Sequence, residues 1–557
     1  MANTLKFGNE NWATKKDSIL AYNDENANFK PLPFVTSRAS TATRVNKAGL
    51  LETVASGVPR VDYLDNSKGS YLLEPASTNL ITQSEAFGNS YWTKSGATIQ
   101  GDASTAGNEK VTGTDADFSG AGNWISTAAT LTTAYNSGDA GHSTTLRIES
   151  DNTASDRAKL SINWTKGVIY KITFDYKVIS GTSANIDVAN NLAVSSDNAL
   201  QSTIWTTKTI YFTADVTGAN LLQIYSSRSG SATDELLIDN VSVKEVQGFS
   251  APSADSPLGA FKLVEGTNNG SHFLYSANAG GSVGNLITTS FFAKASERSW
   301  CKILGYDGSA VWFDLTNGVI GTETSAKGSI ESLSDGWYKI SSTYTSSDAS
   351  KEKGYLYMGT ADGVDGYTGD GTSGVYIFGA QVEQQSYATS YIPNYGESAG
   401  VTRLVDTAIG AGNASTFNST EGVLFWEGSF DSTSTTPGAI ALIGAGSNRV
   451  QLYNSGTSIV ALIQVNGIVV FNQTTNGTIP IISNHKYAIK YALNDFALWI
   501  DGIEIGISAS GSTFGNSALT ELRFSDFGTG YLFANTKQLQ YFNTALTDAE
   551  LIALTTI

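Results

Sequence analysis

The sequence predicts an all-β protein, in which an extended N-terminal region precedes three tandem β-sandwich domains. Charged residues make up only 15% of the 557 residues, and serine, threonine, asparagine and 56 glycines take their place. The charged fraction of an average soluble domain is about 25%. Aromatic residues reach 11%, and apolar runs alternate with period two between turns rich in Gly, Asn, Asp and Ser. Such a chain is built from short strands and tight turns.

The spacing of the runs divides the chain into four parts. Residues 1–78 hold only a few short apolar runs, too thin to bury a core alone, so we expect them to lean on a partner or a neighbouring domain. Residues 79–247 and 248–397 are each predicted to form a sandwich, and residues 398–557 a last all-β unit. A linker with Pro and Gly is predicted over residues 386–406.

The two central parts end in runs that align. LLIDNVSVKEV begins at Leu236, and VYIFGAQVEQQ begins at Val375, so that Phe378 falls under Asp239. Side chains alternate between the two faces of a strand. This alternation predicts one inward face for the set Leu237, Asp239, Val241 and Val243. The chain is therefore predicted to contain two versions of one sandwich.

Asp239 poses a problem in that alignment, because a buried carboxylate costs several kcal/mol unless it is paired, hydrogen-bonded or bound to a metal. It would cap backbone N–H groups of an adjoining loop, or lie at a β-bulge that turns it outward, or bind a structural calcium ion. The sequence leaves the three explanations open. Asp239 is its single candidate metal ligand, and no cofactor is required.

The C-terminal part carries two local signals. Asp501–Gly502 lies between two apolar runs and is the dipeptide best suited to a two-residue type I′ hairpin. Thr547 and Glu550 are predicted to form a capping box at the start of a short helix, with Leu546 and Leu551 as its hydrophobic staple.

Charge and cysteine content exclude several classes of protein. The net charge is −17, from 34 basic and 51 acidic residues, which disfavours nucleic acid and anionic membrane as partners. Cys301 is the only cysteine, so an intrachain disulfide is excluded, and we expect it to be a buried structural thiol. The first residues do not have the pattern of a signal peptide, and no apolar run is long enough to span a membrane.

No constellation of residues predicts an enzyme. His142, His272 and His485 are far apart in the sequence, and no pair of carboxylates is singled out for glycoside hydrolysis. Asp362, Asp365 and Asp370 lie among glycines, but their spacing is not that of an EF-hand, so we interpret them as turn residues. The tryptophans lie in strand-like runs, where core packing is the expected role, so the sugar-binding residues stay unknown.

Three resemblances add to this interpretation. NLITQSEAFGNSYW at 79–92, together with the IDNV of the Asp239 strand, resembles carbohydrate-binding modules of the jelly-roll type, some of which hold a structural calcium near that aspartate. WIDG and FNTALTDAEL resemble laminin-G or concanavalin-A-like jelly rolls. Four further runs resemble segments that recur in bacteriophage tail and fibre proteins: SRASTATRV, PRVDYLD, LLEPASTNL and SYIPNYGESAGVTRLVD.

The resemblances imply a bacteriophage virion protein, a fibre, spike or decoration of head or tail, that is made in the host bacterial cytoplasm. Its N-terminal region would attach to other virion proteins, and its sandwiches would bind host-surface polysaccharide during adsorption. A homo-oligomer, with a trimer favoured, would convert weak contacts into avidity. The alternatives are a purely architectural cement protein and, less favoured, an enzyme that degrades polysaccharide.

Overall fold

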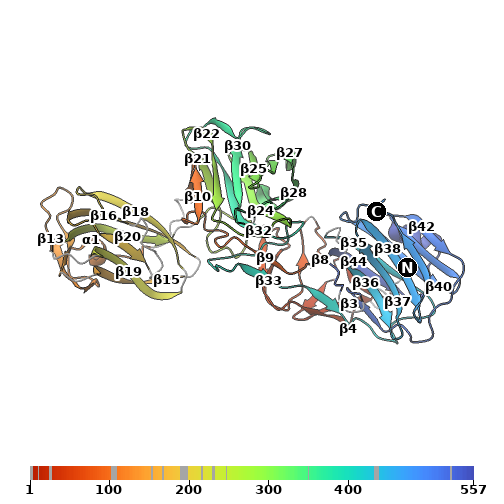
Figure 1. The fold of residues 1–557 in the computed structure, drawn as a ribbon. Helices are drawn as coiled ribbons and strands as arrows, with labels where there is room; N and C mark the ends of the chain where they lie inside the picture. The colour runs from red at the N-terminus through yellow and green to blue at the C-terminus, as the bar shows by residue number, and fades with distance from the viewer. Residues whose placement is uncertain are drawn as a thin grey trace.

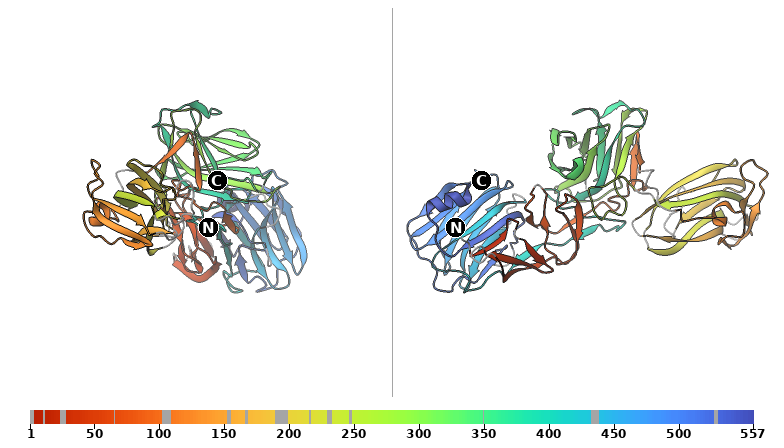
Figure 2. Two further views of the ribbon diagram at one scale, coloured as in Figure 1. Left: turned by 60° about the vertical axis from the view of Figure 1, so that its left-hand side comes forward. Right: turned by 180° about the vertical axis from the view of Figure 1, so that it is seen from behind.

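The computed structural model describes residues 4–557 except 11, 24–27, 65, 102–108, 152–154, 166–167, 189–198, 215–216, 229–232, 246–247, 349, 432–437 and 527–529. These residues form antiparallel sheets, so the all-β prediction is confirmed. Three sandwiches lie in a bent row, and both ends of the chain lie on the C-terminal one (Figures 1 and 2). Within the described residues, no helix is long and apolar enough to cross a membrane.

The C-terminal sandwich packs a 12-stranded sheet against a five-stranded sheet. The larger sheet contains β1 (Leu5–Gly8), β2 (Ala13–Lys15), β3 (Ser18–Asn23), β4 (Asn28–Ser37), β7 (Val61–Asp62), β8 (Ser70–Leu73), β34 (Thr407–Ile409), β35 (Gly422–Phe430), β40 (His485–Ala492), β41 (Asp495–Ile500), β42 (Ile503–Ser508) and β44 (Ala534–Phe542). The smaller sheet contains β36 (Ala439–Gly444), β37 (Asn448–Ser455), β38 (Ser458–Val465), β39 (Ile468–Thr474) and β43 (Glu521–Arg523).

The N-terminal region is part of this sandwich, and the prediction of a separate extended arm over residues 1–78 is wrong. β1 pairs with β44, with Phe7 opposite Leu539, and β8 pairs with the same strand nearer its start. Phe7 and Phe34 are buried in the C-terminal core. The expectation that this region packs against a neighbouring domain is confirmed. Its first strands gain a core in the large sheet, and Val45 and Leu51 are buried beside Phe378 of the middle sandwich.

The middle sandwich packs two six-stranded sheets. One contains β10 (Trp92–Ser95), β23 (Phe273–Ser276), β25 (Trp300–Leu304), β26 (Ala310–Asp314), β27 (Val319–Thr324) and β30 (Tyr355–Gly359). The other contains β11 (Ala97–Gln100), β21 (Phe261–Glu265), β24 (Leu286–Ala295), β28 (Lys327–Ser332), β29 (Trp337–Thr345) and β32 (Gly374–Glu383). A small hairpin-like pair, β22 (Asn269–Ser271) with β31 (Gly366–Thr368), and the 3-10 turn Ser334–Gly336 complete it.

The first predicted sandwich, 79–247, therefore has the wrong start. Trp92 lies opposite Ser276 and Ile99 opposite Leu263, so the 79–92 run opens the middle sandwich and does not pair with the Asp239 strand. A separate sandwich is inserted between β11 and β21. Its helix and strands are α1 (Thr114–Asp117), β12 (Ile125–Thr127), β13 (Ala129–Tyr135), β14 (Thr145–Ser150), β15 (Asp156–Trp164), β16 (Ile169–Ser180), β17 (Asn185–Val188), β18 (Thr206–Thr213), β19 (Gly218–Ser227) and β20 (Glu235–Glu245).

The closing strands β20 and β32 share one irregularity. Each contains a β-bulge after its second core residue, at Asn240 in β20 and at Gly379 in β32, and both residues have positive φ (52° and 51°). The bulge shifts the alternation by one residue, so Ile238 and Val241 both enter the core while Asp239 faces the other side of the sheet. The predicted alignment of the two strands is supported, but the predicted inward face with Asp239 is wrong.

The predicted linker at 386–406 is an ordered junction. Together with residues 38–79 it lies between the middle and C-terminal sandwiches, where β9 (Ser77–Asn79) pairs with β33 (Val401–Arg403) and β5 (Ala42–Val45) pairs with β6 (Leu51–Val54) (Figure 1). We refer to residues 38–79 and 386–406 as the junction.

The local predictions for the C-terminal part are confirmed. Asp501 and Gly502 both have positive φ (50° and 79°) between the paired residues Ile500 and Ile503, as a type I′ turn requires. Thr547 and Glu550 form the capping box of α2 (Asp548–Thr555), and Leu546 and Leu551 are buried together.

Candidate functional site

A buried ion network holds the junction together. Its members are Arg38, Arg60, Glu74, Arg403 and Asp406, all 0–5% exposed at their side chains. Arg38 Nη1 lies 3.0 Å from Asp406 Oδ1 and Arg60 Nη1 lies 2.6 Å from Glu74 Oε2, while Arg60 also pairs with Asp406 and Arg403 with Glu74. Burial raises the pKa of Glu74, but Arg403 and Arg60 outweigh it, so this pKa lies well below its usual value. Each member comes from one of the four runs that resemble bacteriophage segments.

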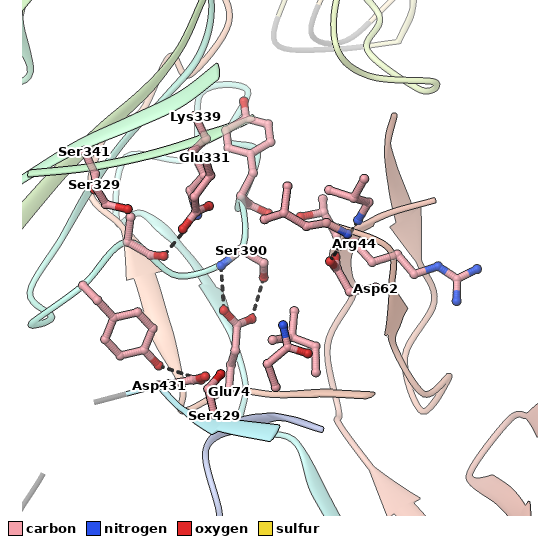
Figure 3. Close-up of a pocket in the computed structure, with 18 of the residues that line it drawn as sticks. Arg44, Asp62, Glu74, Ser329, Glu331, Lys339, Ser341, Ser390, Ser429 and Asp431 are labelled. Carbon is pink, nitrogen blue, oxygen red and sulfur yellow. Dashed lines mark hydrogen bonds and ion pairs between the residues drawn. The ribbon is translucent and has the colours of Figure 1, made fainter. Parts of the chain in front are cut away.

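A cleft of about 460 Å³ opens beside this network (Figure 3). Its walls come from the junction, from β28 and β29 of the middle sandwich, and from β35 and β44 of the C-terminal sandwich. Ser329 and Ser341 lie on one side of the close-up, Ser429 and Asp431 on another, with Ser390 between them. The cleft therefore exists only where the modules keep this arrangement.

The charged groups around the cleft are already engaged. Lys339 Nζ donates to the carbonyl oxygens of Ala388 and Thr389 at 3.1 and 3.0 Å and lies 3.7 Å from Glu331. Asp431 accepts a hydrogen bond from the Tyr387 hydroxyl at 3.1 Å, and burial raises its pKa well above the usual value. Burial thus favours the protonated form of Asp431, and no cation contacts it among the described residues.

A second candidate is an aromatic surface on the outer side of the middle sandwich. Leu274, Leu356 and Met358 of β23 and β30 point into the core, so the alternating positions point outward. We define the aromatic face as these outward residues and their neighbour on β26: Phe273, Tyr275, Trp312, Tyr355 and Tyr357. All but Trp312 are partly exposed.

The rings of the aromatic face stack on each other across the strands. The Phe273 and Tyr357 centroids are 4.2 Å apart with planes at 8°, and those of Tyr275 and Tyr355 are 5.2 Å apart. Lys302 Nζ lies 4.3 Å from the Tyr357 centroid and 5.2 Å from that of Trp312. Because ring faces meet ring faces or ammonium groups, the surface presents ring edges and phenol hydroxyls. Burial raises the pKa of Tyr357 to about 12, so its hydroxyl stays protonated.

Asp239 lies outside both candidates, on the outer face of the inserted sandwich. Its Oδ2 is 2.9 Å from His142 Nδ1, and its Oδ1 accepts from the backbone N–H of Asn240 at 2.8 Å. The His142 ring stacks on Trp205 with centroids 3.9 Å apart. The bulge and these hydrogen bonds thus account for the burial of Asp239. In the described part of the chain, no group of three or more His, Cys, Asp or Glu side chains is placed to hold a metal, and calcium at Asp239 stays a prediction.

The other singled-out residues have structural partners. Cys301 is fully buried, and burial raises its thiol pKa, as expected for a packing residue. Asp362 accepts from the backbone N–H and hydroxyl of Thr322, Asp365 pairs with Lys302, and Asp370 accepts from Thr372 and Ser373. Asp370 therefore stabilises its own turn, as the turn interpretation expects, whereas Asp362 and Asp365 bind residues of β27 and β25.

His272 and His485 also lie in separate places. His272 is buried between the carbonyl oxygens of Gly96 and Tyr367, and His485 contacts Asp501. No histidine of the described residues lines the cleft or joins the aromatic face.

Sequence reasoning missed both candidates. The aromatic face has a signal, the alternation in FLYS and YLYMG, but that alternation does not say which of its two faces is covered. The cleft has no sequence signal, because its walls come from segments hundreds of residues apart.

Comparisons with known proteins find only distant structural likenesses. No family model matches the chain, and a search of curated proteins finds no match. The tandem CBM22 domains of Xyn10C from Paenibacillus barcinonensis overlap 51% of this chain and 100% of theirs, with 13% identity and a TM-score of 0.26. Domains LG4-5 of the mouse laminin α1 chain overlap 54% and 94%, with 13% identity and a TM-score of 0.19.

A sialidase of Trypanosoma rangeli overlaps 99% of this chain and 98% of its own, with 10% identity and a TM-score of 0.23. At such scores the superpositions are loose. The description of the fold as antiparallel sandwiches therefore rests on the sheets themselves.

Proposed function

We propose that this chain is a bacteriophage virion protein, a fibre, spike or decoration, whose sandwiches bind host-surface glycan during adsorption. The observation that carries the glycan-binding part is the aromatic face, a row of partly exposed rings on the open side of a sandwich. The virion part is supported by the four runs of the junction and by the resemblance that they bear to phage segments.

The chemistry of the aromatic face suits a saccharide. Ring edges cover the apolar C–H groups of a sugar, and the hydroxyls of Tyr275, Tyr355 and Tyr357 exchange hydrogen bonds with sugar hydroxyls. Lys353 Nζ lies 4.5 Å from the Tyr275 centroid and adds a donor at the same surface. The expected mechanism is binding, without bond cleavage.

The proposed partners are other virion proteins, further copies of the chain in a trimer, and host polysaccharide. A trimer would present three aromatic faces, so that weak individual contacts add up to a long residence time on a cell. Because residues 5–8 and 28–37 lie in the C-terminal sheet, we place attachment to the particle on the C-terminal sandwich with its N-terminal strands. The proposed location is the virion, after synthesis in the bacterial cytoplasm.

A purely architectural cement protein is the second candidate. The observation in its favour is that the aromatic rings stack on one another, and this stacking stabilises the sheet without any ligand.

Retention of the purified chain on immobilised bacterial surface polysaccharides tests the proposal. We expect retention by at least one polysaccharide of a panel, and a loss of about tenfold for the double variant Tyr355→Ala/Tyr357→Ala. Tyr453→Ala, a partly exposed tyrosine of the C-terminal sandwich, is the matched control. Retention by none would favour the cement protein, and absence from purified particles would contradict both.

A further inference from the structure

We propose that the cleft between the modules is a second ligand site, separate from the aromatic face, which binds a short uncharged saccharide. The proposal rests on polar groups that face the cleft without a protein partner, on the neutralisation of its charges, and on its size. It does not depend on the function of the aromatic face, which lies on the other sheet of the middle sandwich.

Unpaired hydroxyls line the cleft from two sandwiches. Ser329 and Ser341 are cross-strand neighbours on β28 and β29, and Ser429 comes from β35 of the C-terminal sandwich. Over the described ranges, none of these three hydroxyls has a hydrogen-bond partner, although Ser341 is only 4% exposed. Asn535 adds a side-chain oxygen that is buried and also without a partner among the described residues. Buried polar groups are almost always hydrogen-bonded, so the Asn535 oxygen requires a ligand or ordered water. The exposed Ser329 hydroxyl and the half-buried Ser429 hydroxyl are free to bind the same ligand.

Each charged group around the cleft already has an ion-pair or hydrogen-bond partner, which argues for an uncharged ligand. Arg44 pairs with Glu52 at 2.6 Å, Lys327 with Glu323 at 3.0 Å, and Glu74 with two arginines of the ion network. Asp62 accepts from the backbone N–H groups of Val45 and Leu64 at 2.7 and 2.8 Å. A charged ligand would have to displace one of these partners and leave a charge uncompensated.

The remaining walls and the volume define the class of ligand. Phe292 and Ile482 supply apolar surface, and Ile482 is 60% exposed. About 460 Å³ lies in the range of clefts that hold small ligands. Hydroxyl and amide groups beside apolar surface match the two kinds of surface on a sugar ring, so a saccharide of two or three units is the expected occupant.

The experiment uses the full chain and a panel of neutral oligosaccharides, namely maltotriose, cellotriose and N,N′,N″-triacetylchitotriose, with calorimetry and saturation-transfer NMR. We expect at least one of them to bind. Ser329→Trp is expected to abolish binding, since Ser329 lies exposed at the cleft and an indole there fills it without disturbing a core. Ser341→Ala is expected to weaken binding about fivefold.

The control is Ser342→Ala, the next residue of β29, whose fully buried hydroxyl faces the opposite side of the sheet and lacks a partner within the described ranges. It should leave binding unchanged. The proposal would be overturned if no oligosaccharide binds, or if Ser329→Trp leaves binding intact. The cleft would then be a gap between the modules that holds only water. The double variant Tyr355→Ala/Tyr357→Ala should not change binding at the cleft, so the two sites succeed or fail independently.

Discussion

The closing strands β20 and β32 are built alike but are covered differently. Both carry a β-bulge at the same position, and both direct the residue before the bulge to the outer face of the sheet. In β32 that residue is Phe378, which is fully buried among residues of the junction and neighbouring strands. In β20 it is Asp239, which meets only His142 and its own strand in the hydrogen bonds of the described residues. The side chain at this position is thus set by what lies over the sheet.

The largest expected effect comes from placing the residue of one copy in the other. Phe378→Asp would put a carboxylate against Phe292 and Tyr391, whose ring centroids lie 5.8 and 5.7 Å from that of Phe378. Because these rings offer a carboxylate no charge to pair with, we expect a loss of about 3–5 kcal/mol in the free energy of unfolding. Urea denaturation measures it, with Phe378→Leu as the control. A loss under about 1 kcal/mol would show that Phe378 is not tightly packed against these two rings.

The stability of the residues that pack over the outer face of β32 should also depend on pH, because Glu85 lies among them. This carboxylate is 1% exposed and accepts hydrogen bonds from Ser256, Tyr391 and Tyr395, and burial raises its pKa to about 7. Because the folded pKa exceeds the unfolded value of about 4.3, the stabilising contribution is complete below about pH 4 and is lost as pH rises through about 7.

The expected change is on the order of 3 kcal/mol across that window, measured by unfolding at a series of pH values. Glu85→Gln mimics the protonated form and should remove the slope. An equal slope in that variant would exclude Glu85 as its source.

The bulge itself predicts a difference between side chains at Asn240. Its φ of 52° lies in the left-handed region, which Asn and Gly adopt at little cost and β-branched residues do not. Asn240→Val should destabilise the inserted sandwich by about 2 kcal/mol, and Asn240→Gly by under about 0.5 kcal/mol. Thermal unfolding of the two variants side by side provides the measurement. Equal effects would show that the bulge is not maintained in solution.

The smallest expected effect concerns Asp239. Asp239→Asn removes the charge that faces His142 and should cost about 1 kcal/mol, seen as a lower melting temperature. Addition of a chelator to the wild type separates the two explanations. If the chelator lowers its melting temperature but not that of the variant, a calcium ion is bound. If it changes neither, the hydrogen bonds alone account for Asp239.

Features of the sequence that depend on neighbouring residues predicted structure well. The type I′ turn at Asp501–Gly502, the capping box at Thr547, and the alternating strands all form within a few residues, so local propensity decides them. The alignment of the two closing strands could also be predicted from the sequence, because both strands have the bulge at the same position and their apolar runs stay in register. The face that Asp239 occupies was not, since the bulge inverts the alternation after Asn240.

The candidate sites could not be predicted from the sequence, for a related reason. Lining residues of the cleft come from residue 43 to residue 535, and the aromatic face is recognisable only when it is known which side of a sheet stays open. The sequence alone determined the all-β class, the turn at Asp501–Gly502 and the alignment of the two closing strands, because these result from side-chain periodicity and backbone preference. The tertiary structure decided that residues 92–100 join strands beyond an inserted sandwich and that the N-terminal strands complete the C-terminal sheet. Those pairings are set by which distant edges and faces can be buried together, and a free strand edge has no signature of its partner in its own residues.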